Sequence, residues 1–217
     1  MELVEATATV TDLDAFLDRL GAIGRDHGVT VQAFDARYVV GRDHLARAVA
    51  LADRAIARDE NIARERAVEI LLYAAGRRQI DRALEMGVSP VDAAATDGDG
   101  DGDGDRDGDS DGIDSAGCPA VVLVDKASDP DRAGDPDDAS ATETVDQDDA
   151  TAAERAAAAD IQAIPALSPA ATLDTIDHER VTTFFEVTEA ELAATDAPLT
   201  ALVGERVALL QIGRAHV

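Results

Sequence analysis

The sequence predicts a mixed α/β (α+β) fold, a single domain in which a small mixed sheet packs against helices. Residues 2–10 alternate between apolar and polar positions, and residues 119–124 form a short apolar run, two patterns typical of strands. Residues 12–27 and 61–75 instead repeat apolar positions at helical spacing. Because strand and helix signals are interleaved, a mixed class is expected. A chain of 217 residues is long enough to bury its own core.

The N-terminal part begins with a predicted strand at residues 2–10 and an amphipathic helix at 12–27. We expect the helix to end at Gly28, since glycine suits the left-handed position after a helix. Its apolar positions are Leu13, Phe16, Leu17, Leu20 and Ile23. Two further strands are predicted at 29–34 and 38–40, on either side of a turn.

Three helices are expected next. Asp43 is the expected N-cap of the first and Asn61 that of the second. The second is apolar almost all the way round, so we expect it to be central, and Gly76 suits its C-terminal end. The third covers residues 77–86. Its inward-facing residues are predicted to be Ile80, Ala83 and Leu84.

Two acidic insertions interrupt the predicted domain, at residues 94–117 and 127–158. Residues 97–149 contain nineteen acidic and three basic residues and include a repeated Asp-Gly run. Because these segments have no hydrophobic period, they cannot bury enough apolar surface to offset their ordering entropy. We therefore expect two disordered loops that flank a buried strand at 119–124.

The C-terminal part is predicted to contain one strand and two helices. Residues 181–187 are rich in β-branched and aromatic side chains, which favours a strand. Thr188 and Glu191 have the spacing of a capping box and predict a helix at 188–194. Pro198 fits the first turn of a last helix that runs toward Leu210.

The chain is strongly acidic, with a formal net charge of −26 and a pI near 4.2. Lys126 is the one lysine, and aromatic residues make up 3 % of the chain. This composition is typical of proteins in concentrated salt, where screening makes self-repulsion tolerable, so we expect a halophilic host. No apolar run approaches the ~18 residues that a membrane span needs, and no secretory leader is visible, so a cytoplasmic location is expected.

No catalytic, cofactor or metal constellation emerges from the sequence, so we expect neither enzyme activity nor a cofactor. The four histidines are scattered, and Cys118 has no partner motif nearby. An EF-hand-like register in the Asp-Gly run makes an acidic calcium-binding protein the alternative function. That register comprises Asp103, Asp105, Asp107, Gly108 and Asp114, with Ser110 at a position that is normally apolar.

The positively charged residues are concentrated in one part of the chain. Residues 42–82 contain nine arginines against seven acidic residues, and the density is greatest at Arg77 and Arg78, next to Gln79. Guanidinium groups suit phosphates and base edges, which favours contact with a nucleic acid. Ion pairing on solvated helix faces is the alternative interpretation of the same residues.

Two blocks of sequence carry a family resemblance. The first contains NIA at residues 61–63, EILLYAAGRRQI at 69–80 and ALEMG at 83–87. The second contains FFEVTEAEL at 184–192 and LVGERVALL at 202–210. Together they closely resemble the Cgi-type small subunit of the KEOPS complex, the PRPK-binding-protein family. The acidic insertions and the C-terminal tail at 211–217 have no counterpart in the resemblance.

The resemblance implies a non-catalytic subunit that binds the kinase/ATPase subunit of KEOPS and the 3′ CCA end of tRNA. The complex adds threonylcarbamoyl to the adenosine next to the anticodon in tRNAs that decode ANN codons. We place the tRNA contacts at the basic cluster of the first block. The predicted tRNA-binding residues are Arg77, Arg78, Gln79, Arg82 and Arg64.

The two contact surfaces implied by the resemblance leave alternatives open. Tyr73 is either a stacking platform for the CCA end or a core residue. The kinase subunit is expected at an exposed apolar helix surface, for which the last helix is a candidate unless its apolar residues are core. Those residues are Leu202, Val203, Val207 and Leu210. In a halophilic host, tRNA affinity is expected to depend only weakly on salt.

Overall fold

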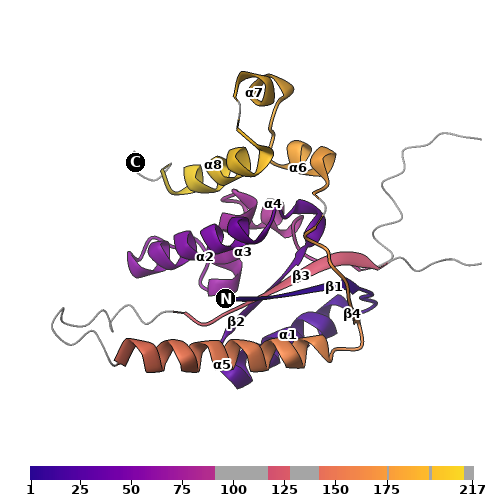
Figure 1. The fold of residues 1–217 in the computed structure, drawn as a ribbon, viewed down its shortest axis with the longest axis vertical. Helices are drawn as coiled ribbons and strands as arrows, with labels where there is room; N and C mark the ends of the chain where they lie inside the picture. Colours follow the sequence, from indigo (N-terminus) through magenta and orange to yellow (C-terminus); the bar gives the residue numbers. More distant parts are fainter. Residues whose placement is uncertain (91–116, 128–141, 175, 196, 213–217) are drawn as a thin grey trace, which may run out of the picture.

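The computed structural model describes residues 1–90, 117–127, 142–174, 176–195 and 197–212. A sheet lies between two layers of helices (Figure 1). The strands are β1 (Glu2–Ala8), β2 (Thr30–Asp35), β3 (Cys118–Asp125) and β4 (Leu167–Pro169). The helices are α1 (Leu13–His27), α2 (Arg42–Ala57), α3 (Arg66–Ala75), α4 (Ile80–Leu84), α5 (Thr142–Gln162), α6 (His178–Phe184), α7 (Glu189–Ala194) and α8 (Leu199–Ile212), with a 3-10 turn, η1 (Ala36–Tyr38), after β2.

The described strands form one sheet in the order β2-β3-β1-β4, and each pairing is antiparallel. Strand β3 is central, since it pairs with β1 on one side and with β2 on the other. Its buried run from Val121 to Val124 explains the continuous apolar pattern in the sequence. The predicted mixed α/β class is therefore confirmed, with an antiparallel rather than a mixed sheet.

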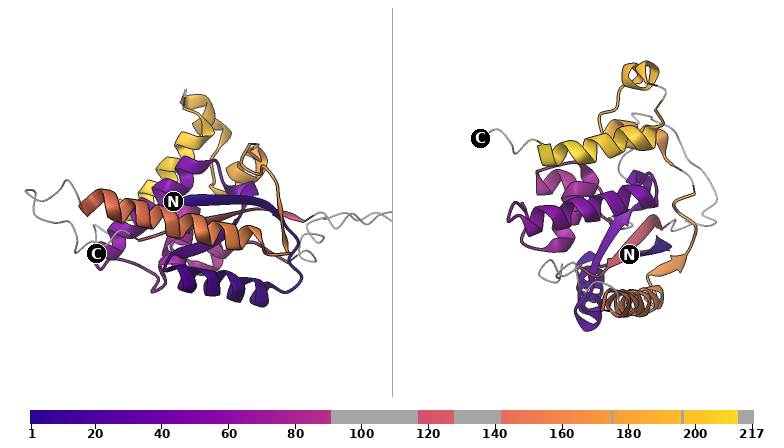
Figure 2. Two further views of the ribbon diagram at one scale, coloured as in Figure 1. Left: turned by 60° about the horizontal axis from the view of Figure 1, so that its bottom comes forward. Right: turned by 60° about the vertical axis from the view of Figure 1, so that its left-hand side comes forward.

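The two faces of the sheet support two separate cores. Helices α1 and α5 lie side by side on one face, where they pack against Val4, Val122 and Val124 (Figures 1 and 2). Helices α2 and α3 cover the other face, over Phe34, Val121 and Leu123, and α8 packs on α2 and α3 from the side away from the sheet. Helix α7 projects from the α8 side, away from the sheet (Figure 1).

Several predicted elements are confirmed together with their caps. Helix α1 begins after Asp12, whose carboxylate accepts the backbone N–H of Ala15, and ends at Gly28 in the left-handed region. Helix α3 is buried over most of its length. Thr188 caps α7 in a complete capping box with Glu191.

The prediction of a strand at residues 38–40 is wrong, and so are the two predicted N-caps. The Asp35 side chain accepts the N–H of Arg37 and caps the short turn η1 instead. Gly41 is the N-cap of α2, so Asp43 lies in the first turn of that helix. Asn61 donates to the Ala63 carbonyl and stabilises a loop, while α3 starts later.

The prediction of a strand at residues 181–187 is also wrong, because most of this segment is helix α6 and the turn that follows it. The Asp177 carboxylate accepts the N–H of Arg180 and caps the helix. Val181 and Phe184, one turn apart, are then buried on the same side of α6. Capping and tertiary packing override the strand propensity of the β-branched residues.

The second predicted insertion, at 127–158, is wrong over its C-terminal part. Helix α5 begins at Thr142 and extends beyond the predicted insertion. Alanine has the highest helix propensity, and Ala157 and Ile161 are fully buried against the sheet, so the alanine-rich segment is helical rather than disordered. The predicted disorder at 94–116 and 128–141 falls outside the described residues.

Helix α4 is short and differs from its prediction in orientation. Of the three residues expected to face inward, Ala83 is fully buried, whereas Ile80 and Leu84 are 44 % and 55 % exposed. A five-residue helix has one buried side, and Ala83 with Met86 occupies it. Ile80 and Leu84 therefore form an exposed apolar pair one turn apart.

Candidate nucleic-acid interface

Most of the predicted tRNA-binding residues lie where α3 turns into α4, at residues 76–82, which we call the α3–α4 corner. Helix α3 ends at Gly76, whose φ of 60° is left-handed and favours glycine. A Cβ added at Gly76 would lie 3.4 Å from the Arg206 carbonyl oxygen of α8. The left-handed turn is therefore what requires glycine here, because a Cβ would meet α8 only at ordinary van der Waals distance.

Arg77 and Arg78 hold the α3–α4 corner against the C-terminal segment. Arg77 donates from Nη1 to Glu186 Oε1 at 3.0 Å and from Nη2 to the Phe184 carbonyl, and its guanidinium carbon lies 5.7 Å from the Phe184 ring centroid. Arg78 Nη2 donates to the Leu210 carbonyl at 3.4 Å. Both side chains therefore connect the two resemblance blocks and retain only their other N–H donors for a ligand.

Gln79, Arg82 and Arg64 are exposed and less engaged. Arg82 forms a 3.5 Å ion pair with Glu85, an exposed contact of the kind that contributes little to stability. The side chains of Gln79 and Arg64 form no hydrogen bond or ion pair with another residue that the structure describes. Arg64 belongs to the loop between α2 and α3, so the structure does not place it in the corner itself.

The buried carboxylate of Glu69 fixes the loop that carries Arg64. Glu69 lies in the first turn of α3 and is fully buried. Its Oε2 accepts the backbone N–H groups of Ile62 at 2.9 Å and Ala63 at 2.8 Å. In the sequence, Glu69 is a charged residue in a helix that is otherwise largely apolar. This mismatch is the sequence signal for its structural role in holding the loop.

Two apolar features considered as contact surfaces are core instead. Tyr73 is 3 % exposed, so it provides no stacking platform for a base. The four apolar residues of α8 proposed for kinase docking pack into the core between α8, α2 and α3 and are buried. An interface needs accessible apolar surface, so this candidate docking face is ruled out.

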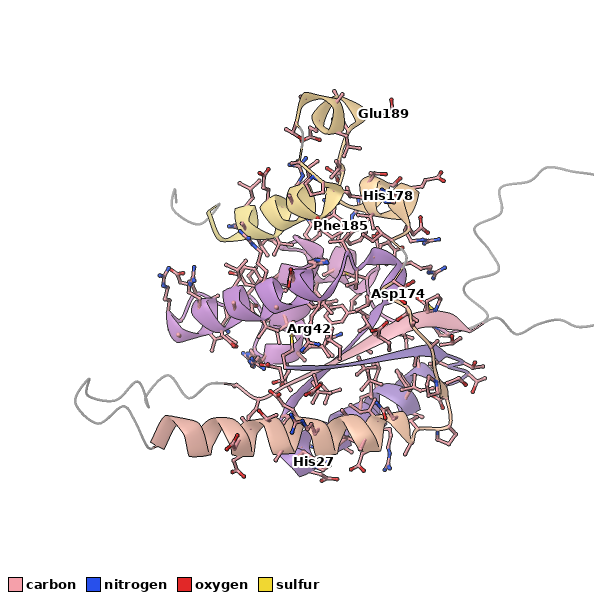
Figure 3. The ribbon with its side chains drawn as sticks, viewed as in Figure 1. His27, Arg42, Asp174, His178, Phe185 and Glu189 are labelled. Atoms are coloured by element: carbon pink, nitrogen blue, oxygen red, sulfur yellow. The ribbon has the colours of Figure 1, made fainter. Side chains whose placement is uncertain are left out.

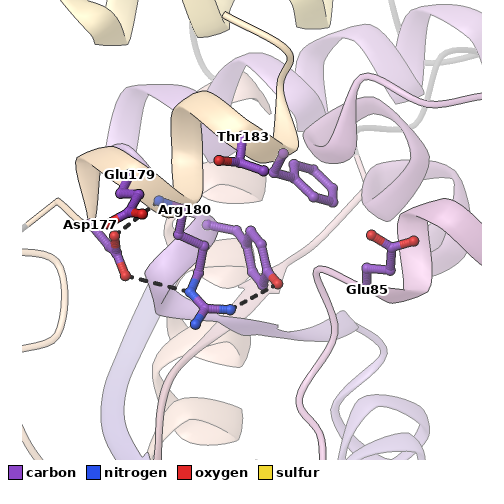
Figure 4. A pocket seen from close by; sticks show the side chains of 7 residues that line it. Glu85, Asp177, Glu179, Arg180 and Thr183 are labelled. Atoms are coloured by element: carbon purple, nitrogen blue, oxygen red, sulfur yellow. Dashed lines mark hydrogen bonds and ion pairs between the residues drawn. The ribbon is translucent and has the colours of Figure 1, made fainter. Parts of the chain in front are cut away.

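An open pocket of about 440 Å³ lies between η1, α4 and α6 (Figure 4). Arg180 lies over the Tyr38 ring, donates from Nη1 to the Tyr38 hydroxyl at 3.2 Å, and places Nε 3.4 Å from Asp177 Oδ2. Glu85 and Glu179 add carboxylates to its lining. Among its described lining residues no nucleophile is hydrogen-bonded to a base, and the carboxylates would repel phosphate.

Two of the described histidines, His27 and His44, and Cys118 have structural roles, whereas His178 is exposed on α6. His27 on α1 faces α5, where its Nε2 lies 2.7 Å from Asp160 Oδ2 (Figure 3). Burial lowers the pKa of His44 to about 4, so its imidazole is neutral at pH 7. Burial raises the pKa of the Cys118 thiol to about 11, which disfavours a reactive thiolate.

Neither the protein-family models nor the curated proteins include a match to the chain. Within the part of the chain that the structure describes, no group of histidine, cysteine and acidic residues could hold a metal ion. Nor is any described helix both long and apolar enough to cross a membrane. The EF-hand-like register at 103–114 and His216 lie outside the described residues.

Proposed function

We propose that the chain is the Cgi-type small subunit of a KEOPS complex, a cytoplasmic adaptor without catalytic activity of its own. It binds the kinase/ATPase subunit of the complex and the 3′ CCA end of tRNA. In this role it supports threonylcarbamoylation of the adenosine next to the anticodon in ANN-decoding tRNAs.

The observation that carries the proposal is the convergence of the two resemblance blocks, which the sequence separates by about 100 residues. The first block contains the α3–α4 corner, and the second begins at the end of α6 and contains most of α7 and α8. Arg77 and Arg78 join the blocks through the carbonyls of Phe184 and Leu210, and the left-handed Gly76 makes the turn that brings both arginines to the second block. Residues that share a sequence signature thus share one structural unit, as expected if the unit has a common function.

For tRNA, the proposal uses the exposed members of the predicted set. Gln79 and Arg82 extend from the α3–α4 corner and Arg64 from the loop held by Glu69. Their amide and guanidinium groups are suited to phosphates and to the edges of unpaired bases, which is the chemistry that a single-stranded CCA end offers. Arg77 serves chiefly to position this surface, whereas the exposed Arg78 makes one 3.4 Å hydrogen bond and keeps its other N–H donors for the ligand.

For the kinase subunit, the proposal uses the exposed apolar pair of α4. Ile80 and Leu84 lie one turn apart and are among the most exposed large apolar side chains of the described residues. Replacing both with glutamate is expected to weaken kinase binding at least tenfold, because a charge would enter the apolar centre of the interface. The melting temperature should barely change, since both residues are exposed. Titration of the purified kinase subunit measures the affinity.

Leu17→Glu is the matched control for this experiment. Leu17 is 47 % exposed on α1, in the helix layer on the opposite face of the sheet. We expect its substitution to leave kinase binding unchanged. Equal binding by the α4 variant and the wild type would place the interface elsewhere, and failure of the wild-type chain to bind the kinase subunit would contradict this half of the proposed function.

A further inference from the structure

Many of the described arginines form ion pairs with carboxylates of the same chain. Arg66 pairs with Asp53 and Asp125, Arg37 with Asp35, and Arg206 with Glu191. Six others are exposed and form no hydrogen bond or ion pair with a described residue, and three of them, Arg47, Arg54 and Arg58, belong to α2 or its C-cap; the rest are Arg19, Arg25 and Arg64. In a chain with a net charge of −26, unpaired cations on one element are a feature that internal ion pairing does not explain.

The three arginines form a row along α2. Their spacing of seven and four residues returns to nearly the same angle on a helix with 3.6 residues per turn. With a rise of 1.5 Å per residue, the row is about 16 Å long. Arg58 and Arg54 also lie where the helix dipole favours a cation, but Arg47, in the middle of α2, does not.

The exposed side chains beside the row on α2 are small, and none of them is a large apolar residue. Ala46, Ala50 and Ala57 are exposed beside it. A groove of about 540 Å³ opens at its N-terminal end, and its lining includes the cations Arg42 and Arg47 and the carboxylates Asp43 and Glu205. A stable protein interface has an apolar centre, which this surface lacks. A charged, flexible polymer needs no such centre.

We propose that Arg47, Arg54 and Arg58 follow the phosphodiester backbone of an RNA strand. This inference rests on the proposed function, which makes tRNA the ligand, and adds a second contact surface outside the α3–α4 corner. The α2 sequence contains no Phe, Tyr or Trp on which a base could stack, so the contact is to phosphates and is independent of base sequence. Arginine forks can bind each phosphate through two N–H groups.

The proposal replaces the weak salt dependence expected from the composition with a measurable one, because phosphate contacts by the row release counterions from tRNA. Each phosphate contacted on a single strand contributes about −0.7 to the slope of log affinity against log salt concentration. The variant Arg47→Gln/Arg54→Gln/Arg58→Gln should therefore reduce the magnitude of that slope by about 2. We would titrate an unmodified tRNA transcript from 1 M KCl down to the lowest concentration at which the circular dichroism spectra are unchanged.

The control variant Arg19→Gln/Arg25→Gln/Arg155→Gln removes the same number of charges from α1 and α5, on the other face of the sheet. It should retain the wild-type slope. Equal slopes for all three proteins, or an equal reduction in both variants, would overturn the row as an RNA contact. Displacement of tRNA by polyglutamate at equal charge concentration would instead indicate an acidic protein partner. Absence of tRNA binding by the wild type would contradict the proposed function itself.

Discussion

Replacing Glu69 with alanine is expected to lower the free energy of unfolding by about 3 kcal/mol, because two backbone N–H groups lose their acceptor. Glu69 Oε2 accepts from both Ile62 and Ala63, and the side chain is fully buried. Alanine would leave these donors without water or protein partners and would add a cavity. Urea denaturation at constant KCl measures the loss. Because the loop carries Arg64, tRNA binding should weaken as well.

Glu69→Gln is the matched variant. Its carbonyl oxygen can replace Oε2, and its amide nitrogen would occupy the place of Oε1, which has no hydrogen-bond partner among the described residues. We expect a change below about 1 kcal/mol, since both backbone donors keep an acceptor. A loss as large as that of alanine would show that acceptor geometry is not what Glu69 contributes.

The second large effect that we expect is a fall in the free energy of unfolding at acidic pH, caused by the titration of His44. Burial lowers the pKa of His44 from 6.5 to about 4 in the folded protein, whereas the unfolded chain keeps the ordinary value. As the pH falls, the unfolded state therefore takes up the proton first. The contribution of neutral His44 to the free energy of unfolding is complete above pH 6.5 and is lost as the pH falls toward 4. The expected loss at pH 4 is about 3 kcal/mol.

The variant His44→Gln separates this effect from the titration of the many carboxylates. In the wild type, His44 Nε2 donates to the Ala74 carbonyl at 2.8 Å and Nδ1 accepts the Val40 N–H at 3.4 Å. Glutamine can replace the donor without titrating. Urea denaturation between pH 7.5 and 4 should show the wild type losing about 3 kcal/mol more than the variant. Parallel pH profiles would refute the assignment.

The sequence was most informative where local signals and packing agree. Asp12 and Gly28 delimit α1, and the apolar run of β3 is a central strand. It failed at 181–187, where the β-branched residues favour a strand but a local cap at Asp177 and the packing of Val181 and Phe184 into the distant core produce helix α6. The sequence predicts disorder over the first part of alanine-rich α5 because small side chains give little hydrophobic signal.

The candidate site was predictable only as a cationic region. Arg77 and Arg78 form the densest point of positive charge, but their partners, Phe184 and Leu210, lie more than 100 residues away in the chain. Charge counting therefore could not distinguish positioning arginines from free ones. To find the arginine row on α2, one must know which cations lack a partner in the folded protein. The sequence does not contain this information.

The central claim is that the chain binds the acceptor end of tRNA. The most direct test compares its affinity, in molar KCl, for one unmodified tRNA with and without the terminal CCA. At this salt concentration counterion release contributes little, so the specific contacts at the α3–α4 corner dominate. We predict at least a tenfold loss of affinity when CCA is removed. Equal affinity for both RNAs, or no binding of either, would contradict the claim.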